Sequence, residues 1–297
     1  MQFEIYCEPR DLAQCIEDLT SNAPDVALLA GGTDLIPRLK DRSLKTKALI
    51  NLMSVDELAG VDTDADGGLI IGAMTTLRSL LDWDALSGPL NGVRDAVGSV
   101  ASVQVRNVAT LGGNTCNASP AADTVPGLIA ANTEVSIAGP SGARRMLLED
   151  LFLGPGKTSL GQGEILVDFR IPPQLPRTGS SYKKHAVRGN SDVAMVGIGA
   201  RISLDEDDKV ADARVVMAAV APTPIRSLRA ERALVGRVVD EATIEEAAAL
   251  ASEDCSPITD VRATARYRTE MVRVFTKRAV REATERVSAP AEPIHRP

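Results

Sequence analysis

Aromatic residues make up only 3% of this 297-residue chain, and its formal net charge is −7. A nucleic-acid surface needs a basic face and aromatic side chains on which bases stack, so the composition favours small molecules or other proteins as partners. No apolar run approaches the roughly 18 residues that a membrane span needs. The first residues also lack the basic and apolar regions of a signal peptide. We therefore expect a cytoplasmic protein without a membrane span.

Cysteine and histidine are too few and too scattered to build a metal centre. The four cysteines, Cys7, Cys15, Cys116 and Cys255, show no CxxC pair and no other ligand spacing. This pattern excludes an iron–sulfur cluster or a structural zinc held by this chain. Isolated thiols also fit a reducing cytosol better than a disulfide framework.

The chain does contain enough apolar residues, 44%, to build a substantial core, and its length suits two or three domains. Residues 1–56 alternate short apolar runs with amphipathic segments, which predicts a strand–helix–strand–helix–strand lobe with parallel strands. Asp11 is expected to cap the first helix, and Thr33 and Asp34 the second. Residues 57–176 have a different sequence pattern, in which short strand-like runs are separated by Gly and Asp turns. This pattern predicts a second lobe.

The last third of the chain predicts a separate small domain over residues 177–288, after a linker within 172–181 that is rich in proline and glycine. Strand patterns cover 193–204 and 213–222, and two helices follow. Thr243 and Glu246 have the spacing of a capping box for the first of these helices. Tyr267, Met271, Val274, Phe275, Ala279 and Ala283 can form the apolar stripe of the second. The tail, 289–297, is expected to be disordered.

Two segments share one order of residues: an apolar run interpreted as a strand, then two adjacent glycines, then a small polar residue. They are LLAGGTDL, residues 28–35, and ATLGGNTCNASPAAD, residues 109–123. Glycines can adopt positive φ and have no Cβ, so their N–H groups can converge on an anion that lies against the chain. One such pair more often marks a plain tight turn. Two together suggest two cradles on one diphosphate, although neither has the spacing of a Rossmann turn or a P-loop.

The same segments, extended to LLAGGTDLIPRLKDR and TLGGNTCNASPAADTVPGLIAANTEV, resemble the paired flavin-diphosphate turns of the FAD-binding (medium) subunits of molybdenum hydroxylases. This family includes the carbon monoxide dehydrogenase medium subunit and the xanthine dehydrogenase FAD domain. The similarity extends to EILVDFRIP, SSYKKHAVRGNSDVAMVGIGARI and RYRTEMVRVFTKRAVREA, so it covers nearly the whole chain. It implies an α+β fold. A two-lobed FAD-binding domain of the PCMH/vanillyl-alcohol-oxidase-like type precedes a small C-terminal α+β domain, a three-stranded sheet with helices.

The resemblance also implies a set of cofactor-binding residues in this chain. They are Leu29, Ala30, Gly31, Gly32, Thr33, Asp34, Thr110, Gly112, Gly113, Asn114, Ser119, Asp123, Leu166 and Lys184. Pro120 would shape the same loop as Ser119, and Asp192 would lie in a loop brought toward the flavin. Three of these residues have ordinary alternatives: Asp123 as a helix N-cap, Leu166 as a core strand residue, and Lys184 as an exposed lysine at a strand end.

The implied cofactor is FAD, held without a covalent bond, because His185 and His295 are the only histidines and neither lies in a double-glycine segment. The resemblance implies no catalytic residue in this chain. It implies an electron-transfer subunit of a heterotrimer, usually paired into a dimer, that serves an external acceptor. A large partner would hold the molybdopterin cofactor, and a small partner the [2Fe-2S] clusters.

Two other functions remain open on the sequence alone. The first is a stand-alone FAD-dependent reductase or oxidase of the same fold, which would need its own substrate pocket and its own catalytic acid or base. The second is a scaffold protein that has kept the fold without a flavin. The paired glycines argue against the second, because glycines carry an entropy cost that the close approach of a cofactor explains.

Overall fold

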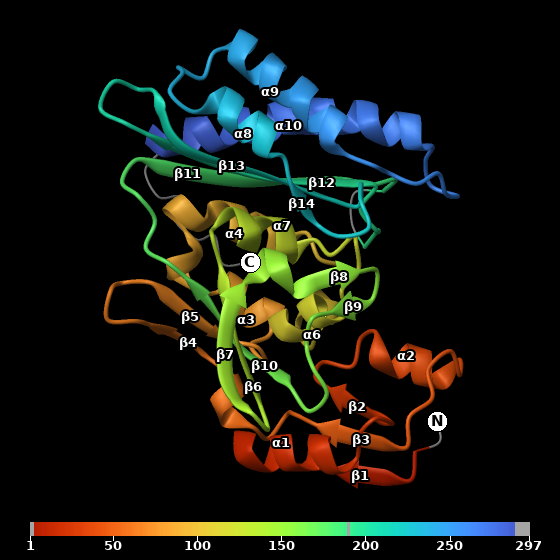
Figure 1. Cartoon of the computed structure of the whole chain (residues 1–297). Helices are drawn as coiled ribbons and strands as arrows, with labels where there is room; N and C mark the ends of the chain where they lie inside the picture. Colours follow the sequence, from red (N-terminus) through yellow and green to blue (C-terminus); the bar gives the residue numbers. More distant parts are fainter. Residues whose placement is uncertain (1–2, 189–190, 289–297) are drawn as a thin grey trace.

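The computed structural model describes residues 3–188 and 191–288, and the tail predicted to be disordered lies outside the described residues. Figure 1 shows three units stacked one above the other: an N-terminal lobe, a middle lobe and a C-terminal domain. This mixture of helices and sheets confirms the predicted α+β class.

The N-terminal lobe is a three-stranded parallel sheet in the order β1-β3-β2, as predicted from the alternation of the sequence. Its elements are β1 (Ile5–Cys7), α1 (Leu12–Ser21), β2 (Val26–Leu29), α2 (Leu35–Lys40) and β3 (Ala48–Asn51). Asp11 caps α1, where its carboxylate accepts a hydrogen bond of 2.8 Å from the backbone N–H of Gln14. The predicted side-chain cap of α2 is wrong. Asp34 holds the N-cap position with a helical rather than an extended backbone, so its carboxylate does not reach back to the helix N–H groups.

The middle lobe is built on a five-stranded antiparallel sheet in the order β4-β5-β10-β6-β7. Its strands are β4 (Val61–Thr63), β5 (Leu69–Gly72), β6 (Glu134–Gly139), β7 (Gly142–Leu147) and β10 (Ile165–Ile171), with a small hairpin of β8 (Phe152–Gly154) and β9 (Lys157–Thr158). Its helices are α3 (Leu77–Leu81), α4 (Asn91–Gly98), α5 (Val103–Arg106), α6 (Leu111–Cys116) and α7 (Thr124–Ala130). Short 3-10 turns, η1 (Asp56–Leu58), η2 (Asp84–Leu86), η3 (Gly88–Leu90) and η4 (Leu148–Leu151), complete the lobe.

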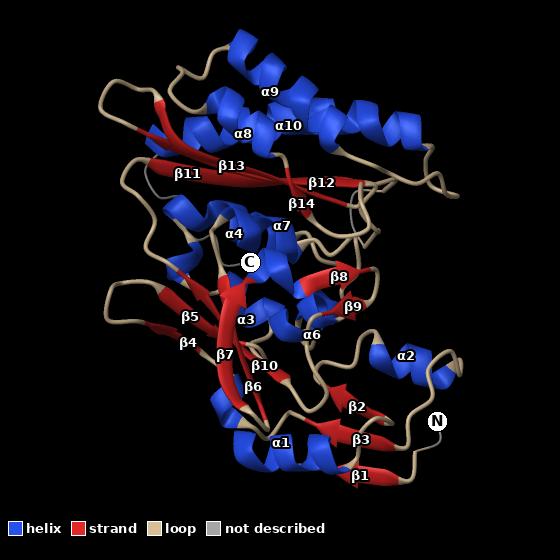
Figure 2. Ribbon diagram, in the orientation of Figure 1, coloured by secondary structure: helices blue, strands red, loops and turns tan. Residues whose placement is uncertain are grey.

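The C-terminal domain has the three long strands that the resemblance implied, of which residue patterns had indicated two, and a two-residue fourth strand extends the sheet. Its elements are β11 (Thr178–His185), β12 (Val196–Leu204), β13 (Val210–Ala218), β14 (Ile225–Arg226), α8 (Leu228–Leu234), α9 (Glu241–Asp254) and α10 (Ala265–Ser288). Figure 2 shows α8, α9 and α10 on one face of this sheet, while α4 and α7 of the middle lobe pack on the other. The sheet is therefore buried on both faces. The second half of the expected linker, Thr178–Ser181, is already part of β11.

Two local expectations in this domain are wrong. The helix α9 is capped by Asp240, whose carboxylate accepts a 2.7 Å hydrogen bond from the N–H of Thr243, so Thr243 is the third helical residue and not the cap. In α10, Tyr267 is 43% exposed and lies outside the buried stripe, which instead includes Arg268. The guanidinium of Arg268 can be buried because it donates to the carbonyls of Met195 and Ala219 and pairs with Asp260.

Each unit has a hydrophobic core, and the cores are joined across the lobes. The core of the N-terminal lobe, around Cys15, Ile50 and Leu58, also includes Ile165 from β10 of the middle lobe. The core of the middle lobe likewise includes Val216 from β13. These shared contacts fix the relative positions of the two lobes that form the site described below.

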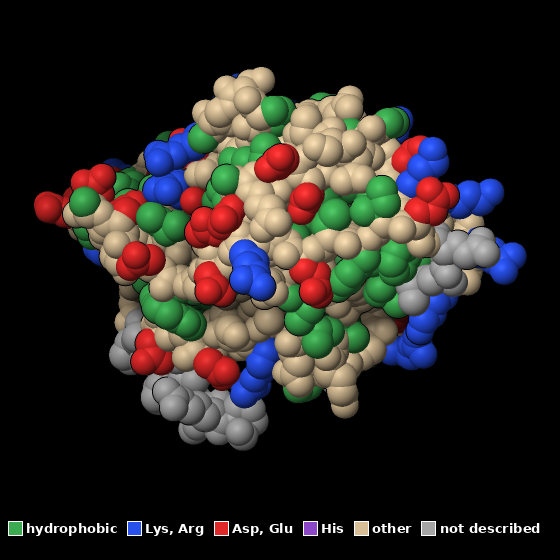
Figure 3. All heavy atoms as spheres, turned by 90° about the horizontal axis from the view of Figure 1, so that it is seen from below, with side chains coloured by type: hydrophobic (Ala, Val, Ile, Leu, Met, Phe, Trp, Pro, Cys, Tyr) green, Lys and Arg blue, Asp and Glu red, His purple; other side chains and the backbone are tan. Residues whose placement is uncertain are grey.

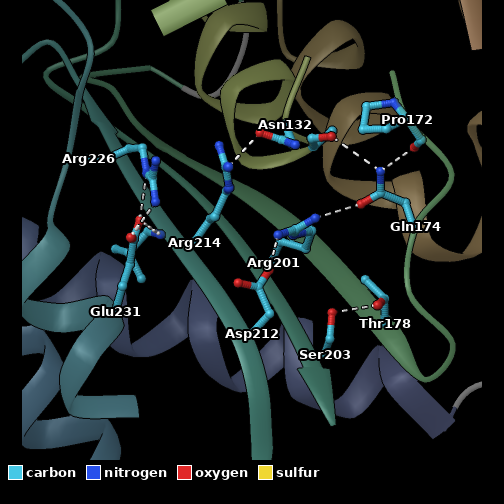
Figure 4. Close-up of polar contacts among 12 residues, drawn as sticks. Asn132, Pro172, Gln174, Thr178, Arg201, Ser203, Asp212, Arg214, Arg226 and Glu231 are labelled. Atoms are coloured by element: carbon cyan, nitrogen blue, oxygen red, sulfur yellow. Dashed lines mark hydrogen bonds and ion pairs between the residues drawn. The ribbon is translucent and has the colours of Figure 1, made fainter. Parts of the chain in front are cut away.

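Arginines on neighbouring strands of the C-terminal sheet tie it to the middle lobe (Figure 4). Arg201 and Arg214 face each other across β12 and β13. Arg214 donates to the carbonyl of Ile129, at the end of α7, and to the side chain of Asn132. Arg201 donates to Gln174, whose amide in turn donates to the carbonyls of Ala131 and Pro172. The interface thus satisfies carbonyls that the end of a helix leaves without partners.

The surface carries charges of both signs. Figure 3 shows the molecule from the side of the N-terminal lobe, where Lys and Arg are interspersed with Asp and Glu and hydrophobic side chains form small patches. No extended basic area is visible on that face. Among the helices of the described residues, none combines the length and the hydropathy needed to cross a membrane.

Candidate cofactor site

A cavity of about 460 Å³ lies between the N-terminal lobe and the middle lobe, with both double-glycine segments in its wall. This volume falls within the range of small-molecule sites. Much of the remaining wall is apolar and comes from both lobes. It includes Leu28, Leu52, Leu58, Met74, Val100, Val105, Leu160, Ile165 and Leu166.

The first double-glycine segment is a turn, as predicted, and its two glycines are required for different reasons. Gly32 has a φ of +70°, which a residue with a Cβ rarely adopts. A Cβ on Gly31 would lie 1.9 Å from the carbonyl oxygen of Val108, so any other residue here would force the two backbones apart. Within the described part of the chain, the backbone N–H groups of residues 31–34 donate to no acceptor. They remain available to a ligand in the cavity.

The second double-glycine segment differs from the expectation, because Gly112 and Gly113 lie in the first turn of α6 and not in a turn after a strand. Thr110 caps this helix, and its hydroxyl oxygen accepts a 3.0 Å hydrogen bond from the N–H of Gly113. The N–H of Gly112 donates to the carbonyl of Ala73 at 2.8 Å. These N–H groups therefore have partners within the protein, and the expected second cradle of free N–H groups is not formed.

The glycines of the second segment instead allow close packing. A Cβ on Gly112 would lie 2.7 Å from the carbonyl oxygen of Ala73, and a Cβ on Gly113 would lie 3.6 Å from the Cβ of Ala30. The two segments thus meet directly, although about eighty residues separate them in the chain. Beside them, Asn114 accepts a 2.6 Å hydrogen bond from the hydroxyl of Thr124 through its Oδ1. This bond leaves the amide NH₂ of Asn114 as the donor that can serve the cavity.

The structure brings most of the residues named from the sequence to this cavity. The wall contains Ala30, Gly31, Gly32, Thr33, Asp34, Thr110, Gly112, Gly113, Asn114 and Leu166. Leu29 lies behind the turn, with its Cδ1 3.1 Å from the position of a Cβ on Gly32. Ser119 and Pro120 line a smaller cavity of about 240 Å³ instead. Asp192 accepts hydrogen bonds from the N–H groups of Arg188 and Val193, so it closes its own loop and lines neither cavity.

Asp123 and Lys184 form a buried ion pair that the sequence did not predict. The carboxylate of Asp123 accepts hydrogen bonds of 2.7 Å from Lys184 and 2.7 Å from the hydroxyl of Tyr182. The ammonium of Lys184 also donates to the carbonyl of Ser99. The two charged side chains are only 9% and 11% exposed. Asp123 does hold the N-cap position of α7, as its ordinary alternative required, but its carboxylate makes no cap bond to the helix. The exposed-lysine alternative for Lys184 is wrong, because this side chain is buried in the ion pair.

The environment of this pair shifts its ionisation. Burial raises the pKa of Asp123, and the nearby Lys184 charge only partly offsets that effect. Burial, followed by the Asp123 charge, raises the pKa of Tyr182 well above its usual value, so this phenol remains a hydrogen-bond donor. Neither Asp123 nor Lys184 lines the cavity, but Lys184 bonds the carbonyl of Ser99, whose neighbour Val100 is part of the wall.

Sequence reasoning missed several residues of the wall. Arg38 lines the cavity from α2, and Ala101, with a φ of +45°, lines it from the loop before α5. Arg106 fixes this loop by donating to the carbonyls of Val100 and Ala101 at 2.7 and 3.1 Å. Arg38 lies four residues after Asp34, and residues four apart on a helix share one face. This spacing could have indicated that Arg38 lies beside the first double-glycine turn. No local signal marks Ala101.

Two family models match successive parts of the chain. Residues 1–174 match the FAD binding domain in molybdopterin dehydrogenase, and residues 180–283 match the CO dehydrogenase flavoprotein C-terminal domain. Together they cover both the two lobes around the cavity and the C-terminal sheet with its helices.

Full-length relatives and solved structures agree with these matches. The chain is 33% identical to the xanthine dehydrogenase FAD-binding subunit of Escherichia coli O157:H7, over 95% of this chain and 96% of that protein. It is 31% identical to the carbon monoxide dehydrogenase medium chain of Afipia carboxidovorans, also over 95% and 96%. The reconstituted CO dehydrogenase from Oligotropha carboxidovorans superposes with a TM-score of 0.92 at 31% identity, over 96% of this chain and 99% of that chain. Quinoline 2-oxidoreductase from Pseudomonas putida 86 gives 0.89 at 29% identity, over 97% and 99%.

Proposed function

Since this chain belongs to the family of FAD-binding subunits of molybdopterin dehydrogenases, we propose that it holds FAD between its two lobes and carries electrons from a partner subunit to an external acceptor. The chain is thus an oxidoreductase subunit. Its FAD is held without a covalent bond, and the molybdopterin and [2Fe-2S] cofactors belong to partner chains.

The observation that carries this proposal is the meeting of the two double-glycine segments around one cavity. A diphosphate needs hydrogen-bond donors and room close to the backbone, and residues 31–34 offer N–H groups that have no acceptor among the described residues. Gly32, with its positive φ, lets this stretch of chain turn at the cavity wall. The apolar wall formed by residues such as Val105 and Leu166 suits a flat ring system.

The proposed cofactor contacts follow from these positions. We assign the diphosphate to the turn Ala30–Asp34, with the hydroxyl of Thr110 and the amide of Asn114 on the opposite side. Gly112 and Gly113 let the second segment approach, Leu29 and Leu166 pack beside the cofactor, and Ser119 shapes the adjoining loop. We assign Asp123 and Lys184 to the site as a pair, because Lys184 bonds the carbonyl next to the wall residue Val100 and Tyr182 holds the carboxylate of Asp123.

The cofactor supplies a ring that accepts electrons one at a time and releases two together. The chain positions that ring, excludes water from it with the apolar wall, and keeps the carboxylate of Asp123 paired. Among the described residues, no group of three or more His, Cys, Asp and Glu side chains could hold a metal ion. The names of the relatives, a FAD-binding subunit and a medium chain, support our assignment of cluster and molybdenum chemistry to partner subunits. The assembly we propose is a heterotrimer that pairs into a dimer in the cytoplasm.

One experiment tests flavin binding and partner assembly together. Purified from its native host, the chain should be yellow, should bleach with dithionite, and should bring with it one large and one small partner chain. A yellow protein that purifies alone and reduces its own substrate would favour the stand-alone reductase or oxidase. A colourless protein would overturn the flavin assignment.

Glycine variants locate the binding site. Gly32→Val and Gly113→Val should lose the flavin while far-UV circular dichroism remains close to that of the wild type, because each substitution alters only the local wall. Gly154→Val is the matched control, since no atom lies within 4 Å of a Cβ at that position. Normal flavin content in both wall variants would contradict the proposed site.

A further inference from the structure

The wall of the cavity contains one unexplained cation. Among the residues that line it, the charged ones are Asp34 and Arg38, which lie four residues apart at the start of α2 and along it. Arg38 is exposed and not packed in the core, so its long side chain is free to turn toward the cavity that it lines. Every other group that the cavity offers to an anion is a neutral donor.

Arg38 is also not engaged by the nearest carboxylates. Asp34 and Arg38 have the spacing at which opposite charges on a helix pair, yet no ion pair joins them in the described structure. Asp41 has a lowered pKa, but hydrogen bonds from Ser43 are the main cause, and the Arg38 charge is a smaller one. The guanidinium makes no side-chain hydrogen bond to any other described residue. Its five N–H donors therefore remain available.

We propose that Arg38 is a further cofactor-binding residue, whose guanidinium bonds the diphosphate of FAD beside the N–H groups of residues 31–34. This inference rests on the proposed function. An arginine presents a planar fork that matches two phosphate oxygens, and such charge-assisted bonds are about twice as strong as neutral ones. Two sources of negative charge oppose the binding of a diphosphate: the carboxylate of Asp34 in the same wall and the chain's net charge of −7. The positive charge of Arg38 partly offsets both.

The ordinary alternative is a solvated arginine on the outer face of a short helix. Lys40 provides the comparison, because it lies on the same helix and is also exposed, but does not line the cavity. Replacing either residue by glutamine lowers the net charge of α2 by one. Only the removal of Arg38 takes away a donor that reaches the cavity.

The test uses the full-length chain, freed of flavin and titrated with FAD or with riboflavin, which has the same ring but no phosphate. Flavin fluorescence reports the Kd, and far-UV circular dichroism reports the fold. Arg38→Gln should raise the Kd for FAD by about tenfold to a hundredfold and weaken its dependence on salt. Arg38→Lys should recover part of the loss, and Lys40→Gln should change the Kd less than about twofold.

The outcomes separate the two proposals. If the wild-type chain does not bind FAD, the proposed function fails. If it binds FAD but Arg38→Gln stays within about twofold, the contact is overturned. Equal losses in Arg38→Gln and Lys40→Gln overturn it as well, because they would show a general charge effect. A riboflavin Kd that rises by the same factor as the FAD Kd also overturns it, because the loss would then not depend on phosphate.

Discussion

The carbonyl oxygen of Val108 lies 1.9 Å from the position that a Cβ would occupy on Gly31. Gly31 lies two residues beyond the end of β2 in the N-terminal lobe, and Val108 lies two residues beyond the end of α5 in the middle lobe. The two lobes therefore meet backbone to backbone at the edge of the cavity. A single missing side chain makes this contact possible.

Gly31→Ala is expected to destabilise the protein by about 1–3 kcal/mol or more, because the added methyl group forces the two backbones apart. The same movement should widen the cavity and lower the amount of FAD per chain. Urea unfolding and the flavin absorbance measure the two effects. Gly154→Ala is the control, since its Cβ would meet no atom within 4 Å. If the two variants have the same stability and flavin content, the close contact does not matter.

Lys184→Met is expected to destabilise the protein by about 3–5 kcal/mol, because it leaves the carboxylate of Asp123 buried without its counter-ion. The double variant Asp123→Asn with Lys184→Met should recover much of this loss, since no isolated charge remains. Chemical unfolding of both variants and of the wild type measures the difference. A double variant that is no more stable than Lys184→Met would show that the lysine matters for another reason.

The effect of Lys184→Met should depend on pH. Burial already raises the folded-state pKa of Asp123, and removing the lysine removes an opposing cause, so the pKa rises further. A carboxyl whose pKa is raised by folding is more stable in its protonated form in the folded protein. The variant therefore has its full stability at low pH and loses part of it as pH rises through the folded-state pKa of Asp123. The variant should therefore lie closer to the wild type near pH 4 than at pH 8. A loss that is the same at both values would contradict this reasoning.

Glu164 should contribute to stability at neutral pH but not in acid. A bidentate hydrogen bond from Arg144 is the main cause that lowers its pKa from 4.5 to about 2. The contribution is full above pH 4.5 and is lost as pH falls toward 2. Since Arg144 is 39% exposed, solvent screens the pair, and we expect about 1 kcal/mol. Urea midpoints of Glu164→Gln and the wild type should differ at pH 7 and converge at pH 2.5, whereas a constant difference would sink the prediction.

Arg214→Met should weaken the contact between the C-terminal sheet and α7. It leaves the carbonyl of Ile129 and the side chain of Asn132 without their donor, at an expected cost of about 2–3 kcal/mol. Calorimetry should show a lower Tm and a broader or split transition as the two parts uncouple. Arg229→Met is the control: its ion pairs with Glu253 and Asp254 are exposed and should contribute less than about 1 kcal/mol. Equal effects of the two variants would argue against the contact.

Several elements could be predicted because their signals are local. The periodicity of residues 1–56 indicates the parallel lobe correctly, and Asp11 caps α1 as its spacing indicates. The β7–β9 segments and α8 were missed. The charged run of β7, for example, Gly142–Leu147, has no clear alternation because the strand lies at the sheet edge and is largely exposed.

The sequence by itself determined that two glycine pairs exist, that no cluster-binding cysteines accompany them, and that residues such as Asp34 and Asn114 stand beside them. Those facts depend only on residue identity and spacing. Only the tertiary structure decided that Gly112 and Gly113 lie in the first turn of a helix and that Lys184 pairs with Asp123. The physical reason is that both features depend on residues far away in the sequence. Gly112 bonds the carbonyl of Ala73, and Asp123 finds its counter-ion about sixty residues later, so the residues next to them do not indicate either contact.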